Sequence, residues 1–312
     1  MAEDASERNS LLRGVRVIDG GLASELEFLG ARIEGPLWSA HVLEDEPEKV
    51  AAAHRAFIKA GSQCIATCSY QVSRIGYAEV GLSPARADAA LLRSVTLARS
   101  VAGEFPARRI LVAASLGPYG AALHNGAEYH GNYNCSYADL VQFHRERIAV
   151  LAGAHGSEAP DLLAFETFPS LEEARAVGEA LEPWPGLCAW FSFSCRDDKR
   201  VSHGEPLAAC ASLVAKFPQT VAIGVNCVPP ARLPSLIAEL RSASHQPVLV
   251  YPNSGEGWDA AARRWTGTTD PAGFGAMAAD WFCAGAQIVG GCCRTGPAHI
   301  REVARAARDS KP

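Results

Sequence analysis

The chain has 312 residues, with 29 Lys and Arg against 34 Asp and Glu, so its formal net charge is −5, and 48% of its residues are hydrophobic. This composition is typical of a globular protein. Because the charges are scattered, we expect no basic surface that would bind nucleic acid or an anionic membrane. No apolar run approaches the ~18 residues that a membrane-spanning helix requires, so a transmembrane role is not expected.

The N-terminal segment 1–13 is polar and acidic and has no basic flank leading into an apolar stretch. We interpret it as a short extension rather than a secretory or transit peptide, and we expect a cytoplasmic protein. Ten cysteines are too sparse for a disulfide scaffold in a chain of this length. In a reducing compartment they should remain thiols.

Eight short apolar runs rich in strand-forming residues recur along the chain, beginning at residues 15, 64, 110, 162, 187, 221, 247 and 287. Such nearly continuous runs are typical of parallel strands buried on both faces. Stretches with helical spacing follow them, at 46–61, 83–103, 137–156, 170–181, 205–217, 230–243, 271–285 and 297–309. The pattern therefore predicts eight consecutive strand–helix units.

Eight such units without a low-complexity linker predict an α/β fold, a single (β/α)8 TIM barrel that occupies residues 1–312 as one domain. A doubly wound open sheet is the alternative, but no G-x-G-x-x-G follows the first strand. Segments 28–46 and 117–137 exceed the usual length of such connections and contain Gly, Tyr, Asn or Trp. We predict that they are binding loops.

Polar residues end many of these apolar runs, where an α/β barrel forms its active site. Each residue alone is also explained as a satisfied strand end. Their convergence on one mouth favours a functional site, and the candidates are Asp19, Ser69, Tyr70, Gln71, Glu166, Thr167, Ser192, Ser194, Asn226, Cys227, Asn253, Cys292 and Cys293.

Three of these candidates are thiols that the barrel would bring together. Cys227 ends the sixth run, and Cys292 and Cys293 end the eighth. Three sulfur ligands with an open fourth position are typical of catalytic Zn²⁺. Neighbouring residues on a strand point in opposite directions, so a turn is required, which Gly290 and Gly291 would permit. A disulfide between the two adjacent cysteines is the competing interpretation.

Most other cysteines fall within predicted strands or helices and are interpreted as small core residues. These are Cys64, Cys68, Cys188, Cys195, Cys210 and Cys283.

Around these residues the sequence resembles the homocysteine S-methyltransferase family. The relevant segments are IDGGLASELE, TCSYQ, FETFPSLEEA, GVNC, YPNSGE and GGCCRTGPAHI. The family includes zinc-dependent barrels such as betaine–homocysteine methyltransferase and the homocysteine module of cobalamin-dependent methionine synthase. The resemblance extends over nearly the whole chain, and GVNC together with GGCCRT is its most specific part.

The resemblance implies that Cys227, Cys292 and Cys293 hold Zn²⁺ and that the thiol of homocysteine takes the remaining position. It implies that Glu166 binds the substrate amino group. It further implies that Asp19, with the backbone of Gly20 and Gly21, contacts the amino acid part of homocysteine. Asn226, beside the first metal ligand, is expected to add polar contacts. A helix N-cap is the alternative role for Asp19.

The methyl donor is expected to be a sulfonium, which becomes a neutral thioether on transfer. Aromatic faces attract such cations, and Trp38 and Tyr70 are the first candidates, followed by Tyr251 and Trp258. Gln71 and Asn253 are expected to orient the polar groups of the donor.

The choice of donor follows from how the sequence departs from other branches of the family. Thr167 stands where the betaine enzyme has a tyrosine, which argues against betaine. Because the chain ends at Pro312 without folate or cobalamin modules, cobalamin is not expected. The resemblance therefore implies an enzyme that transfers a methyl group from S-methylmethionine, and secondarily from S-adenosylmethionine, to homocysteine to form methionine.

Other functions remain open at this point. The alternatives are a regulatory barrel that binds zinc and homocysteine without turnover, a methyltransferase acting on another thiol or a selenol, and a redox-responsive barrel with a Cys292–Cys293 disulfide. For the oligomeric state we expect a monomer.

Overall fold

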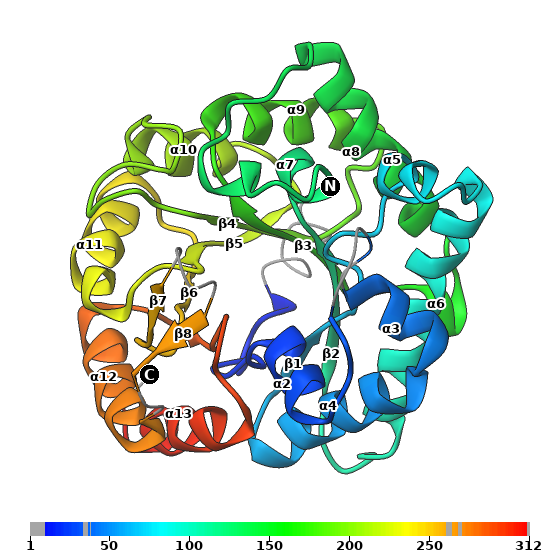
Figure 1. Cartoon of the computed structure of the whole chain (residues 1–312). Coiled ribbons are helices and arrows are strands. Elements are labelled where there is room, and N and C mark those ends of the chain that lie inside the picture. The colour runs from blue at the N-terminus through cyan, green and yellow to red at the C-terminus, as the bar shows by residue number, and fades with distance from the viewer. Residues whose placement is uncertain (1–9, 34–36, 38, 260–263, 268–269, 311–312) are drawn as a thin grey trace.

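The computed structural model describes residues 10–33, 37, 39–259, 264–267 and 270–310. Its centre is a curled sheet of seven parallel strands in the order β1-β2-β3-β4-β5-β6-β9 (Figure 1). The strands are β1 (Cys64–Ala66), β2 (Leu111–Leu116), β3 (Leu162–Phe168), β4 (Ala189–Phe193), β5 (Thr220–Asn226), β6 (Val248–Tyr251) and β9 (Ile288–Val289). Seven of the eight predicted strands are therefore confirmed, and each pairs with its neighbour in sequence order.

The first predicted strand is present as two isolated bridges rather than as a strand. Val17 pairs in parallel with Val289 of β9, and Ile18 pairs in parallel with Cys64 of β1. The backbone N–H of Ile18 also donates to the carbonyl of Val289 at 3.0 Å. This segment thus contacts both edge strands of the sheet.

Helices surround the curled sheet on its outer side (Figure 1). Each of the eight predicted helical stretches contains a helix: α4 (Pro47–Ala60), α6 (Pro84–Gly103), α8 (Tyr137–Ala152), α9 (Leu171–Leu181), α10 (Leu207–Val214), α11 (Leu233–Ala243), α12 (Pro271–Ala284) and α13 (Pro297–Asp309). Pro occupies the first turn of α4, α6, α12 and α13, where its missing N–H and fixed φ suit a helix start.

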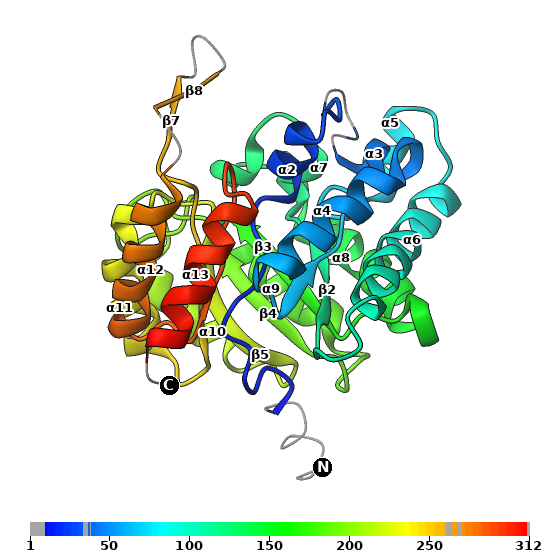
Figure 2. The same ribbon diagram turned by 90° about the horizontal axis from the view of Figure 1, so that it is seen from below.

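Shorter helices occupy the segments between these units. They are α2 (Leu22–Phe28), α3 (Ser39–Asp45), α5 (Arg74–Glu79) and α7 (Tyr119–Ala122), with the 3-10 turns η1 (Ala127–Tyr129), η2 (Gly156–Glu158) and η3 (Pro230–Arg232). The predicted loop 117–137 therefore contains regular structure, α7 and η1. An antiparallel hairpin of β7 (Gly257–Asp259) and β8 (Arg264–Thr266) was not predicted. Figure 2 shows it projecting at the same end of the molecule as α2 and α7.

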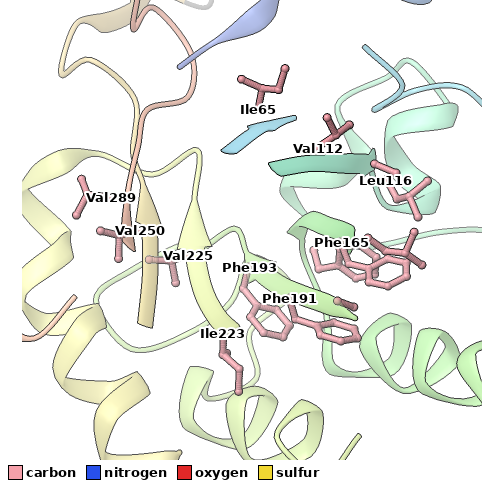
Figure 3. Close-up of a cluster of buried hydrophobic side chains, with 14 of the residues drawn as sticks. Ile65, Val112, Leu116, Phe165, Phe191, Phe193, Ile223, Val225, Val250 and Val289 are labelled. Carbon is pink, nitrogen blue, oxygen red and sulfur yellow. The ribbon is translucent and has the colours of Figure 1, made fainter. Parts of the chain in front are cut away.

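The sheet is buried on both faces, as the apolar runs predict. Alternate residues form a small core inside the curl, with Leu111, Ala113 and Trp190 among its members. The intervening residues form a larger core between sheet and helices, including Val112 and Phe191 (Figure 3). Among the described residues, no helix is long and apolar enough to cross a membrane.

A fully buried carboxylate on α9 anchors the segment 117–137. Glu173 accepts hydrogen bonds from the Tyr119 backbone N–H and, at 2.8 Å, from the Tyr133 hydroxyl. It also contacts Nε2 of buried His144 at 3.0 Å. Nearby, Arg147 donates to the Gly117 carbonyl at 2.8 Å. The network fixes α7 and the chain that follows it against α8 and α9.

Replacing this anchor should destabilise the fold. We expect Glu173→Ala to lower the free energy of unfolding by about 3 kcal/mol, because several buried donors lose their acceptor at once. The matched control is Glu172→Ala, the exposed neighbour on the same helix turn, which should change it by less than about 0.5 kcal/mol. Denaturant unfolding of both variants measures the difference. Equal effects would contradict an anchoring role for Glu173.

Candidate metal and substrate site

A cavity of about 1200 Å³ opens at the carboxyl ends of the strands. The predicted residues that line it are Asp19, Gly20, Gly21, Ser69, Tyr70, Gln71, Glu166, Thr167, Asn226, Cys227, Tyr251, Asn253, Cys292 and Cys293. Residues from distant parts of the sequence therefore meet there, as the strand-end argument predicts. Trp38 lies outside the described residues, as does the side chain of Trp258.

Three thiols meet in the lining of this cavity. The Sγ atoms of Cys227, Cys292 and Cys293 all lie within 4.8 Å of one another. The Sγ atoms of Cys227 and Cys293 are 3.6 Å apart. Two sulfurs bound to one tetrahedral Zn²⁺ at about 2.3 Å would be about 3.8 Å apart. The spacing and the all-sulfur donor set therefore fit a zinc ion, and among the described residues no other group of this kind is found.

The two adjacent cysteines share one side of the chain because the backbone turns immediately after β9. The Thr295 N–H donates to the Cys292 carbonyl at 3.1 Å, which closes a turn through Cys293 and Arg294. Arg294 adopts a positive φ of 67°. The turn predicted from Gly290 and Gly291 thus exists, but the left-handed residue in it is Arg294.

Glycines on both sides of this contact allow close packing. A Cβ at Gly290 would lie 2.2 Å from Ile18 Cγ1, and a Cβ at Gly21 would lie 2.3 Å from the Cys292 carbonyl. The first-strand segment and the chain after β9 therefore pack so closely that neither glycine leaves room for a side chain.

Cys227 follows β5 in a left-handed conformation, with φ of 53°. Its N–H donates to the Tyr251 carbonyl at 3.2 Å, which holds the residue beside β6. Hydrogen bonds from Cys292 and Cys293 hold the pKa of the Cys227 thiol well below its usual value. The cluster thus favours a thiolate at Cys227.

Glu166 reaches the cavity from a bulge in β3. The register with β4 shifts by one residue between Phe165 and Phe168, and Thr167 has a φ of 63°. Asn226 fixes this bulge, because its Oδ1 accepts from the Thr167 N–H at 2.8 Å and its Nδ2 donates to the Thr167 hydroxyl at 2.7 Å. Asn226, predicted to contact substrate, is therefore also a positioning residue for Glu166.

The Glu166 carboxylate is buried beside two hydroxyl groups. Ser115 donates a hydrogen bond to it, and the Tyr251 hydroxyl lies close enough to favour its charged form. Burial nevertheless dominates and raises the pKa of Glu166 to about 7. A cation bound beside this buried carboxyl group would stabilise its ionised form, because the opposite charge offsets the cost of burial.

Asp19 is the second carboxylate of the cavity, and it does not cap α2. The N-cap of that helix is Gly21, without a side-chain bond, whereas Asp19 Oδ2 accepts from the Ala66 N–H of β1 at 2.8 Å. The N-cap alternative was therefore wrong. Burial, and to a smaller extent the nearby Glu166 charge, raise the pKa of Asp19 well above its usual value. The two carboxyl groups thus form one acidic region.

Other polar atoms in the cavity lack a partner among the described residues. Oε1 of Gln71 and Oδ1 of Asn253 are buried without a hydrogen bond. Orphaned buried acceptors and donors are costly unless a ligand or water satisfies them. Their presence along the lining supports the prediction that Gln71 and Asn253 face a bound molecule.

The predicted loop 117–137 supplies four lining residues that sequence reasoning missed individually: His124, Gly126, Glu128 and Tyr129. The Tyr129 hydroxyl lies 3.3 Å from Cys227 Sγ. Only the length of the loop signalled their role, because no spacing pattern distinguishes them. Among the other cysteines, Cys68 lines the cavity and Cys283 is exposed on α12, so the core interpretation was wrong for Cys283.

The thiol cluster should bind one metal ion per chain. We expect Cys227→Ala to reduce bound Zn²⁺ from about one equivalent to near zero under reducing conditions, because two thiols and an open face hold zinc poorly. Cys283→Ala, which removes an exposed thiol elsewhere, should retain the full equivalent. Metal analysis after dialysis against a weak chelator measures both. Full zinc retention by Cys227→Ala would exclude this ligand set.

Comparison with known proteins places these observations in a family. The model of the family described as Homocysteine S-methyltransferase matches residues 16–307. Homocysteine S-methyltransferase YbgG of Bacillus subtilis (strain 168) is 42% identical over 303 residues, covering 95% of each chain. Homocysteine S-methyltransferase of Escherichia coli (strain K12) is 40% identical over 295 residues, covering 92% of this chain and 93% of that protein.

A solved structure is similar over nearly the same length. The metallated form of the homocysteine methyltransferase MmuM from Escherichia coli has a TM-score of 0.83 and 37% identity, covering 96% of this chain and 100% of that chain. With the family model and these relatives spanning almost all of its length, the chain is an enzyme that belongs to the homocysteine S-methyltransferase family.

Proposed function

We propose that this enzyme transfers a methyl group from S-methylmethionine, and secondarily from S-adenosylmethionine, to the thiol of homocysteine in a zinc-dependent reaction. The proposal rests on the cluster of three thiols from Cys227, Cys292 and Cys293 in the lining of a cavity of about 1200 Å³. Family membership supports homocysteine as the acceptor. The metal and the donor are the proposed parts.

We assign the metal to the three cysteines because their donor set and spacing fit tetrahedral zinc with one open position. Bound there, Zn²⁺ would lower the pKa of a coordinating thiol and keep the acceptor sulfur as a thiolate near neutral pH. Cys227, Cys292 and Cys293 would leave the site with net negative charge, which preserves electron density on the acceptor sulfur. The similar enzyme MmuM from Escherichia coli has been solved in a metallated form, in line with this assignment.

Glu166 and Asp19 would bind the ammonium group of homocysteine. Both carboxylates are buried, and each lacks a cationic partner among the described residues. A bound ammonium would offset the repulsion between them and favour their ionised forms. Asn226 would contribute by holding the β3 bulge that points Glu166 into the cavity.

The methyl transfer itself balances without a further cofactor. The acceptor thiolate contributes an electron pair to the new S–CH3 bond, the sulfonium–CH3 bond breaks, and its pair returns to the donor sulfur as a neutral thioether. With S-methylmethionine both products are methionine. Tyr70 presents an aromatic ring to the same cavity, suited to a sulfonium.

We further propose that residues 15–21 act as the eighth strand of a (β/α)8 barrel and that the chain forms one domain. The two bridges of Val17 and Ile18 to opposite edge strands support this closure. Closure would bring Asp19 to the same mouth as Glu166, which the cavity requires.

Removing the Glu166 charge should weaken acceptor binding and leave the metal in place. We expect Glu166→Gln to raise KM for homocysteine by at least about tenfold while zinc content is unchanged, because a buried charged hydrogen bond is lost. Asn226→Ala should cause a smaller rise in KM for homocysteine, because it removes the hydrogen bonds that hold the β3 bulge at Thr167. Steady-state kinetics with metal analysis tests both. Unchanged homocysteine saturation in Glu166→Gln would remove this carboxylate from the acceptor site.

The donor is tested with the zinc-loaded, reduced enzyme. Methionine formation from homocysteine should be fastest with S-methylmethionine, slower with S-adenosylmethionine and negligible with betaine, whose leaving group is an amine. Radiolabelled methyl groups identify the source of the transferred carbon. Faster turnover with betaine would overturn the sulfonium assignment, and zinc binding without methionine from any donor would favour a regulatory protein.

A further inference from the structure

Glu128 is a carboxylate in the cavity that the acceptor site does not use. It belongs to η1 in the segment 117–137, and it lines the same cavity as the three thiols. Its Oε2 atom is buried and has no hydrogen-bond partner among the described residues. Burial raises the pKa of Glu128 to about 7. An unpartnered buried carboxylate oxygen is costly, so its retention requires an explanation.

The backbone around Glu128 is held firmly in place. The Ser194 hydroxyl donates to the Glu128 carbonyl at 3.2 Å, and the Ala127 N–H donates to Asn125 Oδ1 at 3.0 Å. Gly120 of α7 lies so close that a Cβ there would be 2.5 Å from the Glu128 nitrogen. Together with the Glu173 anchor, these contacts present the carboxylate from a fixed segment rather than from a free loop.

The surroundings of Glu128 contain acidic groups rather than a basic partner. Its charge raises the pKa of the Tyr70 phenol, and the Cys227 thiolate raises the pKa of Glu128 itself. No ion pair of Glu128 with Lys, Arg or His forms within the described part of the chain. A cation from outside the chain would therefore be favoured at this position.

Glu128 is separate from the acidic pair that faces the acceptor. Asp19 precedes α2 and Glu166 lies on β3, whereas Glu128 belongs to η1, where the hydroxyl of its neighbour Tyr129 lies 3.3 Å from Cys227 Sγ. The cavity therefore has two acidic positions, one at Asp19 and Glu166 and another in η1, next to the residue that contacts Cys227. A methyl donor must place its sulfur beyond the acceptor sulfur, near the metal ligands, which matches the second position.

We propose that Glu128 binds the positively charged sulfur of the methyl donor, so that its carboxylate and the Tyr70 ring together form the sulfonium subsite. The inference rests on the proposed sulfonium-dependent function. The proposed role of Glu128 is to bind the donor, because the carboxylate pairs with the sulfonium charge, which disappears when the methyl group is transferred. The product thioether is neutral and loses this attraction, which favours its release.

The test compares donor and product binding in Glu128→Gln, which keeps the shape and removes the charge. KM for S-methylmethionine should rise by at least about tenfold, as expected for a partly buried ion pair. KM for homocysteine and the zinc content should stay at wild-type values. Glu128→Asp, which retains the charge, should recover part of the donor affinity. Glu158→Gln, the same change at an exposed position in η2, is the matched control.

Methionine as a product inhibitor distinguishes the two positive charges of the donor, because it carries the ammonium and lacks the sulfonium. Its inhibition constant against S-methylmethionine should be unchanged in Glu128→Gln. If KM for S-methylmethionine and the inhibition constant of methionine rose equally, Glu128 would bind the ammonium group and the proposal would be overturned. An unchanged KM for S-methylmethionine would also overturn it. If the wild-type enzyme forms no methionine from any sulfonium, the proposed function itself fails, an outcome separate from these.

Discussion

The contact between the turn after β9 and the end of β5 is the constraint on which the site depends. Cys292 and Cys293 lie 65 or more residues from Cys227 in the sequence, yet their sulfurs gather within 4.8 Å. This requires a non-glycine residue, Arg294, in a left-handed conformation and a first-strand segment that approaches Cys292 through the backbone of Gly21. Such conformations are costly and persist where the surrounding packing enforces them.

Acidic groups are the common feature of this cavity. The three clustered thiols and the carboxyl groups of Asp19, Glu166 and Glu128 are among the groups that line it. Arg294 supplies a guanidinium among the described lining residues, and it is 3.4 Å from the Glu256 carboxylate. A metal cation, an ammonium and a sulfonium are the species that would neutralise such a site. The proposed metal ion, the ammonium of homocysteine and the sulfonium of the donor are all cations, and each would be stabilised by a different set of these acidic groups.

Much of this architecture is predictable from the sequence, because apolar runs and helical spacing recur with regular order. The same periodicity places Glu166, Asn226 and the three cysteines at strand ends, where a parallel sheet brings them together. The bulge at Thr167 and the left-handed Arg294 are not predictable, since neither residue type favours a positive φ. No sequence pattern singles out Glu128. It becomes informative only when the packing of η1 and its missing partner are seen.

Zinc K-edge X-ray absorption of the reduced enzyme tests the central claim most directly, because it counts the atoms bound to the metal. We expect three sulfur neighbours at about 2.3 Å in the free enzyme and four after addition of saturating homocysteine. A sulfur count that stays at three when homocysteine is bound would show that the acceptor thiol does not reach the metal, and would contradict the proposed activation of the thiol.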